Sequence, residues 1–179
     1  YTAATMLGIS AQDGYASMPE AYSWSNAFFG LVPGSIGETS TIAILLGLAI
    51  LLVTKIASYR IVGGVILGTV VTSYFFNLVG SDTNPMFQMP FWWHMVMGGY
   101  AFGLVFMATE PVSGSHTNAG RWIYGFVIGF MVIMIRVLNP AYPEGMMLAI
   151  LFGNLLSPLI DHFVVSRNIS YRNKVLNAK

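Results

Sequence analysis

Apolar side chains fill five long runs of this sequence, and short polar connections separate the runs. Within each run the apolar positions are continuous rather than alternating, which is typical of membrane helices and excludes transmembrane β-strands. A bilayer core about 30 Å thick is crossed by about 20 helical residues, and about 17–25 are tolerated. The pattern therefore predicts an all-α membrane protein with transmembrane helices at residues 39–54, 61–79, 91–109, 122–138 and 146–165.

The same pattern divides the chain into three parts. Residues 1–38 carry acidic but no basic side chains, so we expect them outside the cytoplasm, with residues 24–31 as a short interfacial or re-entrant piece. Residues 39–165 form the helical bundle, and residues 166–179 form a basic tail. The first and fourth runs are short for a span, and we expect their helices to extend into the polar flanks. Five spans place the two ends of the chain on opposite sides of the membrane.

The positive charges fix the orientation of these spans. Basic residues occur in alternate connections, the connections between them are acidic, and short basic loops stay in the cytoplasm. This alternation predicts an exported N-terminus and a cytoplasmic C-terminus, and Arg136 is its single exception. The residues that define the cytoplasmic side are Lys55, Arg60, Arg121, Arg167, Arg172, Lys174 and Lys179.

Composition narrows the class of protein further. Charged residues make up 8% of the chain, against about 25% in an average soluble domain, so lipid must solvate much of its surface. No basic face is large enough for nucleic acid, and without cysteine the chain supplies neither a disulfide nor an iron–sulfur ligand. The sequence has no Walker loop or Rossmann fingerprint, which excludes ATP hydrolysis and nicotinamide binding on this chain. Because it starts at Tyr1 without a signal-peptide pattern, we expect the C-terminal part of a longer protein.

Three pairs of glycines spaced four residues apart mark the second, third and fourth spans. Such pairs form a flat stripe on a helix, which lets two backbones approach closely. Tight helix packing is the simpler interpretation, and room for a flat cofactor or an ion path is the alternative. The pairs are Gly64 and Gly68, Gly99 and Gly103, and Gly125 and Gly129.

Four acidic residues near the spans are candidates for an ion path. Asp161 lies in the last apolar run, where an ionisable group costs about 2.5–3.5 kcal/mol on insertion scales, so it marks either an ion path or a helix end from which it snorkels or caps. Glu144 follows a proline-rich loop, and a place in the first turn of the fifth helix is the alternative to a cation site. Glu110 ends the third span, where a solvated acid is the default, and Glu38 starts the first span as a candidate cap.

Histidine and threonine residues complete the candidates. His94, His116 and His162 lie in separate segments with no shared spacing, which is unlike a metal site. Thr5 ends a run of small residues at 2–5 that leaves its hydroxyl accessible to a modifying enzyme. A hydroxyl that is merely solvated is the alternative at this position.

Four strings carry a family resemblance: residues 33–38 (PGSIGE), 80–87 (GSDTNPMF), 136–151 (RVLNPAYPEGMMLAIL) and 158–162 (PLIDH). Together they resemble the B subunit of the sodium-translocating NADH:quinone oxidoreductases. The resemblance covers nearly all of the chain, and the third string is the most specific. The D subunit of the related Rnf complex is similar but departs most in that string, so it is the alternative family.

The resemblance implies one five-helix half of a ten-helix, inverted-repeat protein of the bacterial inner membrane. In this family a flavin transferase joins FMN through its phosphate to a threonine, and residues 2–5 match the end of the transferase motif with Ala3 in place of the usual glycine. The resemblance thus places FMN on Thr5, from which electrons derived from NADH pass through riboflavin to quinone while sodium ions move outward. Asp161 matches a family acid linked to sodium passage, and Glu144 and Glu110 are further ion-path candidates. The implied partners are the other subunits of the complex.

Two other classes of function fit the same pattern of spans. A channel or passive transporter built of two inverted five-helix halves would move solute without a redox cofactor. A scaffold subunit would only pack against partners that carry cofactors. A flavin on this chain would distinguish the redox subunit from both.

Overall fold

Helices and turns make up the regular structure of this chain. The computed structural model describes residues 5–14, 22–35, 37–81, 83–139 and 142–177, and within these ranges it contains no strand. The all-α class predicted from the apolar runs is therefore confirmed.

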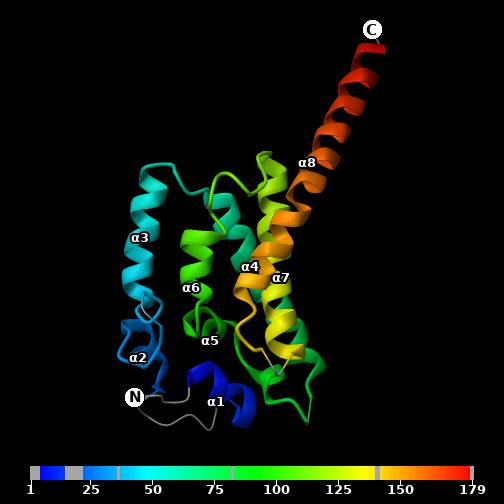
Figure 1. Cartoon of the computed structure of the whole chain (residues 1–179). Coiled ribbons are helices and arrows are strands. Elements are labelled where there is room, and N and C mark those ends of the chain that lie inside the picture. The colour runs from blue at the N-terminus through cyan, green and yellow to red at the C-terminus, as the bar shows by residue number, and fades with distance from the viewer. Residues whose placement is uncertain (1–4, 15–21, 36, 82, 140–141, 178–179) are drawn as a thin grey trace.

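Three helices in the described part of the chain are long and apolar enough to cross a membrane. They are α4 (Tyr59–Val79), α7 (Asn118–Leu138) and α8 (Met146–Asn177). The first expected span is the apolar helix α3 (Thr41–Val53), whose 13 residues extend only about 20 Å at 1.5 Å per residue. Figure 1 shows that α3, α4, α7 and α8 run along the long direction of the bundle and that the two ends of the chain lie at opposite ends of the molecule.

The third expected span is a broken element, so the prediction of one continuous helix at residues 91–109 is wrong. Its parts are α5 (Phe91–Val96), α6 (Tyr100–Phe102) and the π-helical turn η4 (Gly103–Met107). The break falls at Gly98, whose φ of 59° lies in the left-handed region that favours glycine. The π-helical turn is closed by the bond from Ala108 N to Gly103 O, 2.7 Å long.

Glycine stripes bring α4 and α7 into backbone contact. A Cβ atom added at Gly64 would lie 3.1 Å from Gly125 Cα, and one at Gly68 would lie 3.1 Å from Gly129 Cα. The prediction that these two pairs serve tight packing is confirmed. The third pair differs, because a Cβ at Gly103 would meet the side chain of Met146 rather than a helix backbone.

The outer surface of the bundle is apolar, as contact with lipid requires. Leu46 on α3 is 65% exposed, Phe75 on α4 is 59% exposed and Leu155 on α8 is 75% exposed. α8 projects beyond the other helices (Figure 1) and continues to Asn177, so most of the expected tail is helical.

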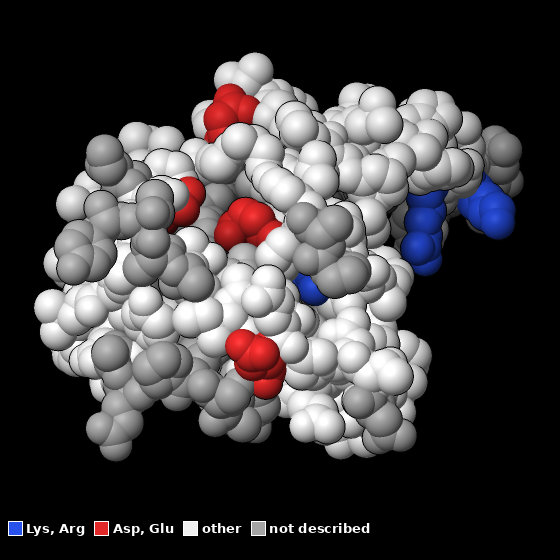
Figure 2. Space-filling view, turned by 60° about the horizontal axis from the view of Figure 1, so that its bottom comes forward, with Lys and Arg blue, Asp and Glu red and all other residues white. Residues whose placement is uncertain are grey.

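Short elements cover the end of the bundle at which the described chain begins. α1 (Met6–Asp13) lies there beside the 3₁₀ turn η3 (Pro85–Gln88), and α2 (Trp24–Phe29) leads into α3. Most of the expected short piece at residues 24–31 is thus a helix, which starts after the N-cap Ser23 and ends at Phe29. Acidic side chains are scattered over this face, whereas most of the basic surface visible in Figure 2 lies on the projecting part of α8.

Candidate functional site

Arg136 is the buried centre of the most polar part of the interior. It lies in the last turn of α7 and is 0% exposed. Its guanidinium donates to the carbonyl oxygens of His94 at 2.7 Å, Met97 at 3.0 Å and Glu144 at 3.2 Å. A helix end leaves carbonyls without partners, and here Arg136 satisfies those at the break after α5. The alternation of basic and acidic connections depends on charges in loops. Arg136 is buried inside the bundle and is not a loop charge, which explains why it was the exception to that alternation.

Glu144 binds the backbone on the other side of the break between α5 and α6. Its Oε1 lies 3.6 Å from Arg136 Nη2 and accepts from Gly99 N at 2.8 Å. The expected place in the first turn of the fifth helix is wrong, because α8 starts at Met146 and Glu144 precedes it. Glycine is favoured at residue 98, whose φ of 59° lies in the left-handed region, and a Cβ there would also meet the Glu144 carboxylate.

Glu38 approaches the same backbone from the segment before α3. A Cβ at Gly99 would lie 2.8 Å from Glu38 Oε1 and 3.3 Å from Glu144 Oε1, so the two carboxylates converge on this glycine. Partial burial and then the charge of Glu144 raise the pKa of Glu38. The expected capping role falls instead to Ser40, whose hydroxyl accepts from Ala43 N at 3.4 Å.

Thr5 lies beside this carboxylate pair. Thr5, Glu38, Gly98 and Glu144 line one cavity of about 100 Å³, which joins four segments that are far apart in the sequence. Thr5 itself is exposed and is the N-cap of α1, where its hydroxyl accepts from Gly8 N at 3.2 Å.

The surroundings of Thr5 fit a phosphate ester but not an enclosed flavin. The free N–H groups and dipole at the start of α1 favour a negative group on the exposed side of Thr5. The neighbouring cavity of about 100 Å³ is smaller than the roughly 300–1,000 Å³ of cavities that enclose drug-sized ligands. A flavin ring attached here would therefore lie outside that cavity. Residues 2–4, which carry the rest of the motif, lie outside the described residues.

Asp161 lies at the opposite end of α7 from Arg136. Its carboxylate accepts from Ser115 Oγ at 2.6 Å, His116 N at 2.8 Å and Thr117 Oγ1 at 2.6 Å. Thr117 is the N-cap of α7, so Asp161 ties the middle of α8 to the start of its neighbour. Because α8 continues to Asn177, Asp161 lies in the middle of this helix, and the capping alternative takes the form of hydrogen bonds to the start of α7.

Glu110 closes a local turn at that same end. Its carboxylate accepts from Val112 N at 2.9 Å, from Ser113 N at 2.9 Å and from the Ser113 hydroxyl. These hydrogen bonds lower the pKa of Glu110. The four candidate acids thus form two groups, Glu38 with Glu144 and Glu110 with Asp161, at opposite ends of the bundle.

Histidines contribute no metal centre in the part of the chain that is described. No group of three or more His, Cys, Asp or Glu side chains suitable for a metal occurs among the described residues. His94 is buried on α5, and its Nδ1 has no hydrogen-bond partner among them. His116 precedes α7, and His162 lies on α8.

Sequence comparisons place these features in a family. The NQR2, RnfD, RnfE family matches residues 1–170. Three relatives are each named as the B subunit of a Na(+)-translocating NADH-quinone reductase. The chain is 62% identical to the one from Azotobacter vinelandii, 58% to that of Chromohalobacter salexigens and 57% to that of Stutzerimonas stutzeri. The matches cover 96%, 97% and 96% of this chain but only 43%, 42% and 43% of the relatives, so the chain spans less than half their length.

Proposed function

Because this chain belongs to the NQR2, RnfD, RnfE family, we propose that it is the C-terminal part of the B subunit of a sodium-translocating NADH:quinone reductase. The observation that carries the proposal is the 57–62% identity to relatives of that name over nearly the whole chain. Those names favour this complex over the D subunit of an Rnf complex. They also favour a redox role over a channel or a scaffold. The proposed partners are the other subunits, quinone and the flavin transferase that matures the protein.

Thr5 is the proposed attachment point for FMN. The exposed hydroxyl at the start of α1 is accessible to a transferase, and the helix N-terminus favours the phosphate. When bound, the flavin supplies electron transfer, here from NADH-derived electrons toward riboflavin and quinone. The chain's own contribution is to hold the phosphate at Thr5 and to keep the ring outside the small cavity with Glu38 and Glu144.

The test uses the full-length subunit expressed together with its flavin transferase. Thr5→Val preserves the shape of the side chain but removes the oxygen that would form the ester. We expect flavin fluorescence of the subunit on a denaturing gel to disappear in Thr5→Val and to persist in the matched control Thr83→Val, which changes an exposed threonine outside the motif. A fluorescent band that survives Thr5→Val would place the flavin elsewhere.

The two groups of acids are the proposed ends of a sodium path. With an exported N-terminus, Asp161 and Glu110 lie toward the cytoplasm, and Glu38 and Glu144 lie toward the outer face. In Asp161→Asn we expect quinone reduction by the complex to require a higher sodium concentration for half-maximal rate. Glu110→Gln serves as the comparison at the same end. If Asp161→Asn keeps the wild-type sodium dependence, Asp161 has only its structural role at the start of α7.

A further inference from the structure

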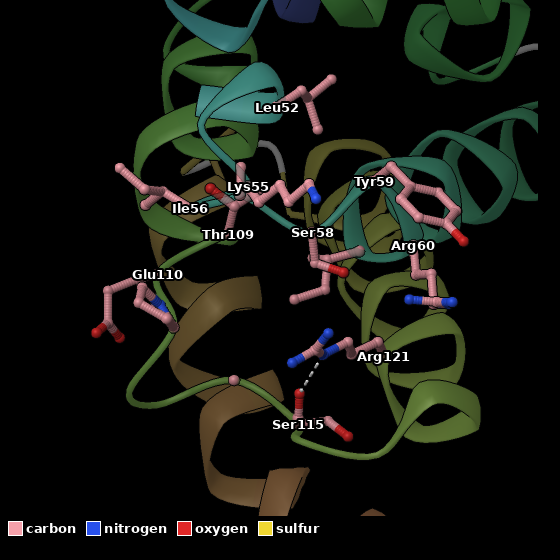
Figure 3. A pocket seen from close by; sticks show the side chains of 14 residues that line it. Leu52, Lys55, Ile56, Ser58, Tyr59, Arg60, Thr109, Glu110, Ser115 and Arg121 are labelled. Atoms are coloured by element: carbon pink, nitrogen blue, oxygen red, sulfur yellow. Dashed lines mark hydrogen bonds between the residues drawn. The ribbon is translucent and has the colours of Figure 1, made fainter. Parts of the chain in front are cut away.

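A basic cavity of about 570 Å³ lies where α3 turns into α4 and where α7 begins. Lys55 comes from the connection between α3 and α4, Arg60 from the first turn of α4 and Arg121 from the first turn of α7. Figure 3 shows these three side chains around the cavity. Arg136 and Glu144 form the only ion pair between described residues, so none of the three cations is neutralised within the described part of the chain.

Donor groups around this cavity remain available. Arg121 uses Nε to donate to Ser115 O at 3.3 Å, and its terminal N–H groups have no hydrogen-bond partner among the described residues. The hydroxyl of Ser58 is buried and likewise lacks a partner among them, although Ser58 is the N-cap of α4. The carboxylate of Glu110 also belongs to the lining, but it accepts from Ser113 and points away from the cations in Figure 3.

The backbone at Lys55 is held in an uncommon conformation. Its φ of 60° makes Lys55 the non-glycine residue with positive φ in the described part of the chain. Residues other than glycine adopt this conformation at an energetic cost, and here it ends α3 in the left-handed conformation common after a helix C-cap. The turn that imposes it, closed by bonds from the amides of Ile56 and Ala57 to Leu51 O, keeps Lys55 beside the cavity.

An apolar cavity is lined by residues of the same two helices, farther from the connection between them. Its volume is about 180 Å³. On α3, Leu52 lines the basic cavity and Leu48 lines the apolar one. On α4, Ile61 lines the basic cavity and Val62 lines the apolar one. A ligand that fits both cavities would carry an anionic head and a hydrocarbon tail.

We propose that the basic cavity binds the phosphate group of an anionic phospholipid whose acyl chain extends along α3 toward the apolar cavity. Guanidinium groups bind phosphate through paired hydrogen bonds, and an ammonium group binds it as a point charge. Basic pockets between membrane helices are the known setting for such headgroups. A soluble phosphate compound offers the same head, but it would leave the apolar cavity unused. The site is separate from Thr5 and does not depend on the proposed redox function.

The first experiment measures how fast Lys55 reacts in the unaltered, full-length complex. The complex is placed in nanodiscs of phosphatidylcholine alone, of phosphatidylcholine mixed with phosphatidylglycerol, or of phosphatidylcholine with inorganic phosphate in solution. Acylation of lysines by an amine-reactive reagent is followed by peptide mass spectrometry. Lys174, exposed near the end of α8, is the internal reference for general effects of the membrane charge.

Each result of this experiment decides the proposal. We expect phosphatidylglycerol to slow acylation of Lys55 about tenfold relative to Lys174, which corresponds to about 1.4 kcal/mol of binding, and inorganic phosphate to have little effect. Equal protection by inorganic phosphate would replace the lipid with a soluble phosphate compound. Unchanged reactivity of Lys55 under all conditions would remove the site altogether.

A variant pair tests which residues form the site. The double substitution Arg60→Gln and Arg121→Gln should abolish the protection of Lys55 by phosphatidylglycerol. The matched control, Arg167→Gln with Arg172→Gln, removes the same charge from the projecting part of α8 and should keep the protection. Native mass spectrometry of the complex should show at least one fewer retained phosphatidylglycerol only in the first variant. Protection that is lost equally in both would indicate a general charge effect and would overturn the proposal.

Discussion

Removal of the Arg136 side chain tests whether a buried guanidinium holds the break between α5 and α6. The substitution is Arg136→Met in the full-length subunit, which keeps much of the side-chain volume but removes every donor. Loss of one partner from a buried, hydrogen-bonded ion pair costs about 3–5 kcal/mol. The partners left behind here are the carbonyl oxygens of His94, Met97 and Glu144 and the Glu144 carboxylate.

The structure also predicts which of these partners matters most. The Glu144 side chain is 32% exposed, so solvent screens its charge, and we expect Glu144→Gln to cost only about 1 kcal/mol or less. The three carbonyls are charge-assisted acceptors that cannot turn toward water when the guanidinium is removed. Arg136→Lys keeps the positive charge but cannot reach three carbonyls with a fork of donors. It should therefore recover only a minor part of the loss.

Thermal unfolding in detergent, followed by fluorescence-detected size exclusion, measures these differences. At about 2–4 °C per kcal/mol for a unit of this size, Arg136→Met should lower the midpoint by about 6–20 °C. The control is Arg167→Met on the exposed part of α8, which should change stability by no more than about 0.5 kcal/mol. A midpoint for Arg136→Met close to wild type, or full recovery in Arg136→Lys, would refute the assignment of this role to the guanidinium.

Three further substitutions follow from the same structure and use the same assay. Gly129→Ala places a methyl group against the carbonyl of Val65, so it should separate α4 from α7 and lower the midpoint by several degrees; an unchanged midpoint would contradict the backbone contact. The fold lowers the pKa of Glu110, so the charged carboxylate stabilises the folded state at pH values above its ordinary pKa of 4.5. This stabilisation is lost as the pH falls through the lowered pKa. Glu110→Gln should therefore be less stable than wild type at neutral pH and equally stable in acid. The fold raises the pKa of Glu38, so the charged carboxylate destabilises the folded state at pH values above the raised pKa. Glu38→Gln should therefore be more stable than wild type at neutral pH, and this difference in stability should vanish below its ordinary pKa of 4.5.

Continuous hydropathy is enough to find the long helices. The expected spans at residues 61–79 and 122–138 correspond to α4 (Tyr59–Val79) and α7 (Asn118–Leu138), and the fifth begins at Met146 as expected. Hydropathy cannot find the break in the third span, because the residues around Gly98 are as apolar as those of an unbroken helix. The relevant signal is the adjacent glycine pair at residues 98–99, whose second member also fits a packing stripe and so conceals the break.

The candidate site depends on contacts between residues far apart in the chain. Asp161 accepts from two hydroxyls and a backbone amide before α7, 44–46 residues earlier, and Arg136 donates to carbonyls about 40 residues earlier. A single sequence carries no information on such pairs, so the acids could be named as candidates but not assigned to partners. The sequence did contain one signal for Arg136, because a charged residue inside an apolar run is costly unless it is paired.

The hydrogen bonds of Arg136 at the break between α5 and α6 also restrict where a cation can pass through this bundle. In transporters built of inverted repeats, unwound carbonyls and half-helix ends bind the coupling ion. Here the corresponding carbonyls of His94 and Met97 already accept from Arg136, which stays charged at any working pH. Two unit charges about 4 Å apart repel by about 4 kcal/mol even at an effective dielectric constant of about 20. We therefore expect a cation at this end of the bundle to pass the carboxylates of Glu38 and Glu144 and not the carbonyls of the break.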